Sequence, residues 1–206
     1  MNFPDLMEGA LMVVVLLFSV IIHEVAHAYT AWLNGDPTPR VMGRITLNPL
    51  PHIDPLGTVL LPLLLLLTGA GIIFGWAKPV LINSRNFRNL RWGQLTVSAA
   101  GPLSNLLLAT FFASLLRLNP TNPGLALMAL WGCKINIFLA LFNLMPIPPL
   151  DGSHLVAAFL PAPMARLYSY LEPVGFVLIL LLFYSGIMSV ILMPIYRQIA
   201  HLLLGT

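Results

Sequence analysis

Charge is scarce in this sequence. The chain holds 10 Lys and Arg and 7 Asp and Glu among 206 residues, so charged residues make up only 8% of it. A typical soluble domain carries about 25% charged residues. Hydrophobic residues supply 58% of the chain, and the mean hydropathy is +0.89. This balance excludes an ordinary soluble domain, because too little polar surface is available to face water.

Cysteine is nearly absent as well. Cys133 is the one cysteine, so an internal disulfide and a thiolate metal cluster are both excluded. It lies in an apolar run, where we interpret it as a small hydrophobic residue. The basic residues are spread thinly and fall mostly in loops, so we expect no nucleic-acid partner. The N-terminus lacks the positive region of a secretory signal.

Long apolar runs are abundant. Five of them approach or exceed the roughly 20 residues that a helix needs to cross a bilayer. They cover residues 10–33, 56–74, 94–116, 124–145 and 173–193. The sequence therefore predicts an all-α polytopic membrane protein. We expect a single membrane-embedded domain over residues 1–206, in the cell membrane with the lipid bilayer around it.

The first apolar run contains His23, Glu24 and His27 in an H-E-x-x-H arrangement. On a helix, residues i and i+4 share a face, so both imidazoles can reach one ion. Glu24 can then act as general base toward a metal-bound water. An ionisable group at the bilayer centre costs at least about 2.5–3.5 kcal/mol, and a metal would compensate that cost. An interhelical polar cluster without metal is the alternative.

A catalytic zinc site needs a third protein ligand and an open position for water. Among the remaining acids, Asp151 is the best candidate, because it ends the proline-broken stretch 143–152. Adjacent prolines prevent a regular helix there, and Gly152 permits close approach to a neighbour. A stiff loop of this kind can hold a carboxylate toward a neighbouring helix. The alternative is an ordinary Asp at a helix N-cap.

The pairing of H-E-x-x-H with N-x-x-P-x-P-x-L-D-G over residues 143–152 resembles the site-2 protease family of intramembrane metalloproteases. The resemblance covers most of the chain and includes residues 43–49, 52–55, 75–80 and 99–105. It implies that Zn²⁺ is held by His23, His27 and Asp151 and that Glu24 is the catalytic base. It also implies that Asn143 contacts the substrate. No PDZ or CBS domain is present, so we expect a short, minimal form of the family.

The expected activity is hydrolysis of peptide bonds in transmembrane or membrane-anchored proteins. A membrane metal-ion transporter is the main alternative, and it would place polar ligands along a path. Here the acids and histidines of the apolar segments concentrate in one place. A non-catalytic scaffold would more often lack one motif residue. The oligomeric state stays open.

Several polar residues outside the motif call for plainer interpretations. We interpret His52 as a structural loop residue and His154 as a residue beside the metal site. We expect Lys134 to extend toward a headgroup region. Gly101 and Asn105 fit a packing notch with an interhelical hydrogen bond.

Charge and depth give two topological expectations. The residues before the first segment carry acids but no base, whereas the loop after it carries Arg40 and Arg44, so we expect the N-terminus outside and the active site toward the cytoplasm. His27 and Asp151 must also reach the same depth. We therefore expect 56–74, which Pro62 interrupts, to be re-entrant, with 75–80 returning as a short membrane-associated strand. The first, third and fourth segments would then form a three-helix catalytic core.

Overall fold

The computed structural model describes residues 3–60, 64, 77–118 and 120–205 of the chain. Within those ranges every regular element is helical, which confirms the predicted all-α class. Among the described residues, four helices are long and apolar enough to cross a membrane, and a bent helix pair would make a fifth. The four candidate spans are Glu8–Leu33, Leu90–Arg117, Pro123–Asn143 and Ile187–Leu204.

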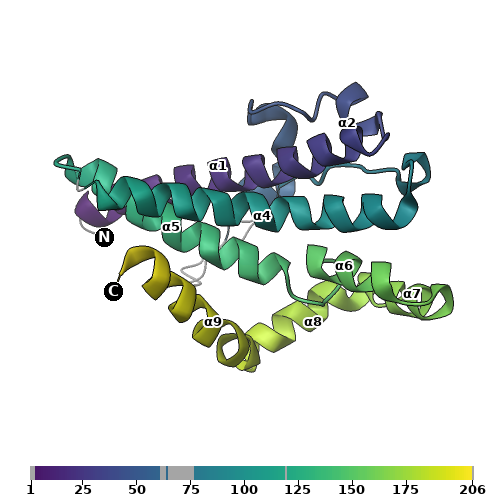
Figure 1. Cartoon of the computed structure of the whole chain (residues 1–206). Coiled ribbons are helices and arrows are strands. Elements are labelled where there is room, and N and C mark those ends of the chain that lie inside the picture. Colours follow the sequence, from purple (N-terminus) through teal and green to yellow (C-terminus); the bar gives the residue numbers. More distant parts are fainter. Residues whose placement is uncertain (1–2, 61–63, 65–76, 119, 206) are drawn as a thin grey trace.

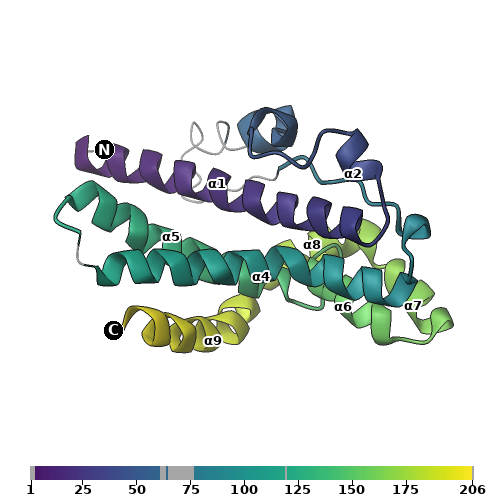
Figure 2. The ribbon, with the colours of Figure 1, turned by 45° about the horizontal axis from the view of Figure 1, so that its top comes forward.

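Three of these helices pack together along their length (Figures 1 and 2). They are α1 (Phe3–Leu33), α4 (Leu90–Arg117) and α5 (Pro123–Asn143). α1 and α5 run in the same direction, and α4 runs against them. Ala109 and Phe112 of α4 are buried against Cys133 and Ile137 of α5. The predicted three-helix core is thus confirmed.

Local sequence explains where α4 and α5 begin. Asn89 and Asn122 precede them, and each side-chain oxygen accepts a hydrogen bond from the backbone N–H of the third residue beyond, at 2.9 and 3.1 Å. Such N-caps satisfy N–H groups that the helix itself leaves without partners. Pro123 follows as the first residue of α5, a position where its missing N–H costs nothing.

The chain between α1 and α4 makes no net crossing, because both the end of α1 and the start of α4 lie at the same end of the bundle (Figure 1). α5 also ends toward that side, which satisfies the depth argument for His27 and Asp151. The predicted re-entrant segment 56–74 lies mostly outside the described residues. Its described start belongs to a short π-helix, Pro55–Leu60.

The predicted strand at 75–80 does not form within the part of the chain that the structure describes. Residues 77–83 run without regular structure. The N–H of Lys78 donates to the carbonyl of His52 at 2.9 Å, and the N–H of Val80 donates to Glu24. A neighbouring strand would need the N–H groups of Lys78 and Val80 as hydrogen-bond donors. Both already donate elsewhere, one to a loop carbonyl and the other to a side chain.

The prediction of one continuous segment at 173–193 is wrong. The run divides into α8 (Glu172–Tyr184) and α9 (Ile187–Leu204) at Gly186, whose φ of +76° ends the helical path. α9 returns along α4 and α5, where Tyr196, Ile199 and Leu203 cover the core (Figure 2). Hydropathy averages over this break, because the residues on both sides are equally apolar.

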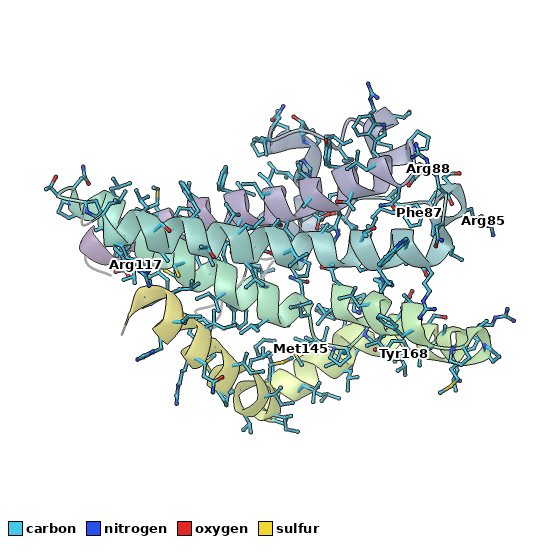
Figure 3. All side chains as sticks on the ribbon, viewed as in Figure 1. Arg85, Phe87, Arg88, Arg117, Met145 and Tyr168 are labelled. Carbon is cyan, nitrogen blue, oxygen red and sulfur yellow. The ribbon has the colours of Figure 1, made fainter. Side chains whose placement is uncertain are left out.

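The outer faces of the helices carry large apolar side chains. Leu107 and Phe111 of α4 are 73% and 60% exposed, an exposure that suits lipid and not water. Several arginines lie at the two ends of the bundle. Figure 3 shows Arg85 and Arg88 at one end and Arg117 at the other. This distribution is the one expected when lipid covers the middle of the bundle.

Asp36 joins the two loops at the Arg85 end of the bundle. Its buried carboxylate accepts from Thr38, through the backbone N–H and the hydroxyl, at 3.1 and 2.6 Å. It also accepts from the backbone N–H of Asn83 at 2.7 Å and from the side-chain amide of Asn86 at 2.8 Å. Burial raises the pKa of Asp36, but these donors outweigh it and hold the pKa below its ordinary value.

Replacing Asp36 by Asn should destabilise the protein by about 1–3 kcal/mol at pH 7, because a neutral amide is a weaker acceptor for those donors. A carboxylate with a lowered folded-state pKa stabilises fully above its unfolded pKa of about 4 and loses that effect as pH falls through the folded value. The melting temperatures of wild type and variant in detergent should therefore converge below about pH 4. A constant difference from pH 7 to pH 3 would contradict this account, and the exposed Glu172→Gln serves as control.

Candidate metal centre

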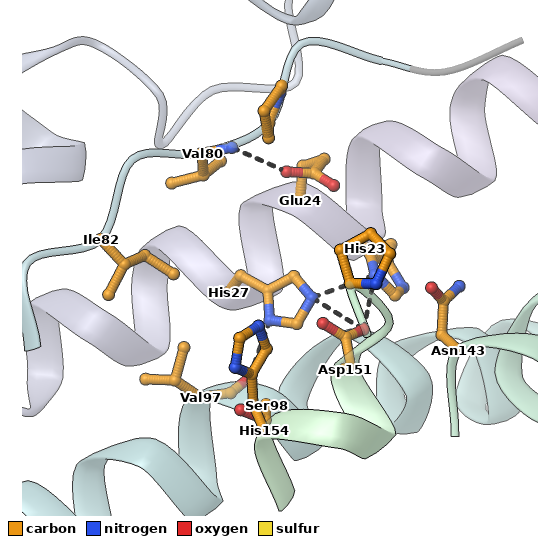
Figure 4. Close-up of a pocket in the computed structure, with 12 residues that line it drawn as sticks. His23, Glu24, His27, Val80, Ile82, Val97, Ser98, Asn143, Asp151 and His154 are labelled. Carbon is orange, nitrogen blue, oxygen red and sulfur yellow. Dashed lines mark hydrogen bonds and ion pairs between the residues drawn. The ribbon is translucent and has the colours of Figure 1, made fainter. Parts of the chain in front are cut away.

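His23, His27 and Asp151 converge at the end of the three-helix core (Figure 4). The two imidazole Nε2 atoms lie 3.0 Å apart. Asp151 Oδ2 lies 3.1 Å from Nε2 of His23 and 3.2 Å from Nε2 of His27. The histidines share one face of α1 because they are four residues apart. The structure thus brings together all three residues that the sequence predicted as ligands.

Asp151 reaches this place because the chain reverses after α5. A tight turn over residues 144–150 leads into α6 (Asp151–Phe159), with Asp151 in its first turn. A Cβ at Gly152 would overlap the carbonyl group of Leu144, so only glycine lets the start of α6 pack so closely on the end of α5. The hydroxyl of Tyr168 donates to the carbonyl of Pro146 at 2.7 Å and holds the turn from outside.

Hydrogen bonds fix the tautomers of both histidines. Nδ1 of His27 lies 2.7 Å from the carbonyl oxygen of Val97, which can only accept, so Nδ1 carries the proton. Nδ1 of His23 lies 2.6 Å from Oδ1 of Asn105. In a neutral imidazole with a protonated Nδ1, Nε2 presents a lone pair. Both Nε2 atoms therefore aim lone pairs into the space that they share with Asp151.

The donor set fits a metal ion. Two imidazole nitrogens and a carboxylate oxygen, all electron-rich, face one another at about 3 Å and would repel without a positive charge between them. Oδ2 of Asp151 is buried and accepts no hydrogen bond. Two histidines and one carboxylate form a common ligand set of catalytic zinc sites with an open fourth position.

α4 closes the site from one side through Gly101. A Cβ at this position would overlap ring atoms of His23 and His27. The notch predicted at Gly101 therefore lies directly against the two imidazoles. The absence of a side chain here lets α4 bring the Val97 carbonyl and Asn105 within hydrogen-bonding distance of both rings.

Glu24 lies beside the ligands and meets a loop. Its Oε2 accepts a hydrogen bond from the N–H of Val80 at 3.0 Å (Figure 4). The buried Arg44 holds the same loop, because its guanidinium donates to the carbonyl oxygens of Pro51, Lys78 and Pro79. The loop 77–82 is thus anchored over the C-terminal half of α1.

A cavity of about 280 Å³ opens at this place. Its walls combine the three candidate ligands and Glu24 with apolar and polar residues from α4, α5, α6 and the loop 77–82. The lining residues are His23, Glu24, His27, Pro79, Val80, Ile82, Val97, Ser98, Asn143, Pro149, Asp151 and His154. Space for a small polar group next to the ligands is therefore present.

The other residues singled out in the sequence fall into two groups. Asn143 and His154 line the cavity (Figure 4). His52 and Lys134 do not: Nε2 of the buried His52 lies 2.9 Å from the carbonyl of Thr46, and the ammonium of Lys134 lies over the Trp131 ring at 5.2 Å. Sequence reasoning missed the Val97 carbonyl, since a backbone acceptor leaves no trace in residue type.

Comparisons with known proteins agree with this geometry. Residues 120–182 match the family model described as "Peptidase family M50". The chain is 39% identical over 193 residues to the Bacillus subtilis (strain 168) protein named "Putative zinc metalloprotease YwhC", which covers 89% of this chain and 84% of that protein. It is 30% identical over 172 residues to "Putative zinc metalloprotease Rip2" of Mycolicibacterium smegmatis (strain ATCC 700084 / mc(2)155). That match covers 81% of this chain but only 63% of the relative. No solved structure matches the chain.

Replacing Gly101 by Ala should lower the zinc affinity of the purified protein about tenfold or more, because the added methyl group pushes both imidazoles from their positions. Competition with a chromophoric chelator measures the affinity. The matched control is Gly93→Ala on the same helix, whose Cβ would meet the Phe87 ring. It should lower stability by about 1–3 kcal/mol and leave zinc affinity unchanged. Equal losses of affinity in the two variants would contradict the role given to Gly101.

Proposed function

Because this chain belongs to peptidase family M50, the site-2 protease family of zinc metalloproteases, we propose that it hydrolyses peptide bonds of transmembrane or membrane-anchored proteins. The observation that carries the proposal is the convergence of two imidazoles and a carboxylate beside Glu24 in one cavity. That cavity lies among helices whose outer faces suit lipid, which supports a membrane-embedded substrate.

His23, His27 and Asp151 are the residues that would hold Zn²⁺. When bound there, the ion supplies a Lewis acid that polarises a peptide carbonyl and lowers the pKa of water to about 7. Glu24 follows the first ligand and lines the same cavity. It is the residue that takes a proton from the attacking water and delivers it to the leaving nitrogen.

We assign substrate binding to Asn143. Its side-chain amide donates one hydrogen bond to the carbonyl of Leu139 at 2.9 Å. A primary amide carries two N–H donors, so the second is available to a substrate carbonyl in the cavity that Asn143 lines. This contact would orient the carbonyl group beside Glu24 and the ligands.

The transporter alternative finds less support. It requires successive polar ligands along a path through the bundle. Among the described residues, the group formed by His23, His27 and Asp151 is the one cluster with a metal-binding arrangement. A single site beside a general base favours chemistry over transit.

The orientation of the chain is also a proposal. The catalytic end of the bundle carries Arg85 and Arg88, whereas Arg117 lies at the opposite end (Figure 3). Arg91, in the first turn of α4, and Arg40, in the short helix Thr38–Val41 after α1, add positive charge near the catalytic end. Positive loops favour the cytoplasmic side. We therefore place the catalytic end at the cytoplasmic face and the N-terminus outside. A cysteine can be introduced in place of Arg85 and treated with a labelling reagent added from the external side of the membrane. Reaction of that cysteine would contradict this orientation.

Replacing Glu24 by Gln should reduce cleavage by about 10²–10⁴-fold, since glutamine keeps the shape of glutamate but cannot accept the proton. The assay uses protein reconstituted in liposomes with a tagged single-span substrate, and elemental analysis should show unchanged zinc content. The control is Glu8→Gln on the same helix, where Glu8 accepts a hydrogen bond from Trp131 at 2.7 Å, far from the cavity. Cleavage by Glu24→Gln at the wild-type rate would remove Glu24 from the mechanism.

A further inference from the structure

Three polar side chains are completely buried in the core behind the metal site. They are Ser19 of α1, Asn105 of α4 and Asn136 of α5, each 0% exposed. None of them lines the cavity. Burying an amide or hydroxyl among apolar helices is costly unless hydrogen bonds satisfy it. Their bonds therefore need a complete account.

The hydrogen bonds begin at a backbone carbonyl and run in one direction. Ser19 Oγ donates to the carbonyl of Val15 at 2.8 Å, so its lone pairs face outward as acceptors. Nδ2 of Asn136 donates to Ser19 Oγ and to the carbonyl of Gly132, both at 2.8 Å. Both N–H groups of Asn136 are thus used, and its Oδ1 must point the other way.

That oxygen determines how Asn105 lies. Nδ2 of Asn105 donates to Oδ1 of Asn136 at 2.8 Å, which turns Oδ1 of Asn105 toward His23. Oδ1 lies 2.6 Å from Nδ1 of His23 and can only accept, so this ring nitrogen carries the proton. Nε2 of His23 is left with its lone pair toward His27 and Asp151.

We propose that Asn105 and Asn136 are positioning residues for the metal centre, with Ser19 orienting Asn136. They lock His23 in the tautomer and ring orientation whose Nε2 binds the ion. His27 needs no such series, because the backbone carbonyl of Val97 sets its tautomer directly. The inference rests on the proposed metal site and adds residues that touch neither the ion nor the substrate.

A role confined to holding the three helices together would lead to a different prediction for these side chains. If the three side chains only hold α1, α4 and α5 together, any loss of their bonds lowers stability and leaves metal affinity unchanged. Aspartate at position 105 separates the two roles. Its carboxylate still accepts from Nδ1 of His23, but it cannot donate to Asn136. It should therefore lower stability and preserve the metal site.

The experiment compares the full chain with Asn105→Leu and Asn105→Asp in detergent after removal of metal by a chelator. Zinc affinity, the ligand-field spectrum of bound Co²⁺ and the melting temperature of the metal-free protein are measured. Asn105→Leu should weaken zinc binding about 10–100-fold and change the Co²⁺ spectrum. Asn105→Asp should bind zinc nearly as tightly as wild type, although it melts at a lower temperature.

The matched control is Cys133→Ala. Cys133 is 0% exposed on α5, three residues from Asn136, and takes no part in the hydrogen-bond series. Its truncation should lower the melting temperature without changing zinc affinity. Wild-type affinity in Asn105→Leu, equal weakening in Asn105→Asp, or weakening in Cys133→Ala would each overturn the inference.

A failure of the proposed metal site gives a different result, because wild type itself would then bind no zinc. A failure of the proposed hydrolysis alone would leave the zinc affinities expected for these variants unchanged. Should Asn105→Leu fail to fold, Ser19→Ala replaces it as the test. This variant removes the hydroxyl of Ser19, which accepts a hydrogen bond from Asn136. Asn136 is connected to His23 through Asn105. A smaller loss of zinc affinity is expected with Ser19→Ala, and unchanged affinity would overturn the inference.

Discussion

The structure depends on holding three electron-rich atoms, two imidazole nitrogens and one carboxylate oxygen, about 3 Å apart inside an apolar bundle. Such a group is stable only if positive charge, from a metal ion or a proton, lies among the atoms and if their other polar atoms find partners. α1 supplies both imidazoles from one face, Gly101 lets α4 approach them, and the turn after α5 delivers Asp151. These three features all serve this one arrangement.

Depth in the membrane follows from the same requirement. α1 and α5 run in parallel, so the last turns of α1 and the turn after α5 lie at the same end of the bundle (Figure 1). α4 runs against them and presents its middle turns to the site, with Val97, Gly101 and Asn105 spaced four residues apart on one face. One face of α4 thereby presents three features to the two histidines. They are the backbone carbonyl of Val97, the missing side chain of Gly101 and the side-chain amide of Asn105.

Sequence predicted the parts of the site that rest on side-chain chemistry and spacing. The i, i+4 histidines and the proline-stiffened Asp151 belong to this class. The break at Gly186 was missed, because a two-residue turn hardly changes the hydropathy of the run around it. Asn136 was missed for another reason: a lone Asn in an apolar helix does not reveal its partner on another helix. Residues 56–74 stay a prediction, since most of them lie outside the described ranges.

X-ray absorption at the zinc K-edge of the purified protein tests the central claim most directly. The account predicts about one zinc per chain, with two imidazole nitrogens at about 2.0–2.1 Å and carboxylate or water oxygens at about 2.0–2.2 Å. The imidazole scattering should fall by half in His27→Ala. Protein that retains no zinc when purified in its presence, or zinc whose spectrum lacks imidazole and is unchanged in that variant, would contradict it.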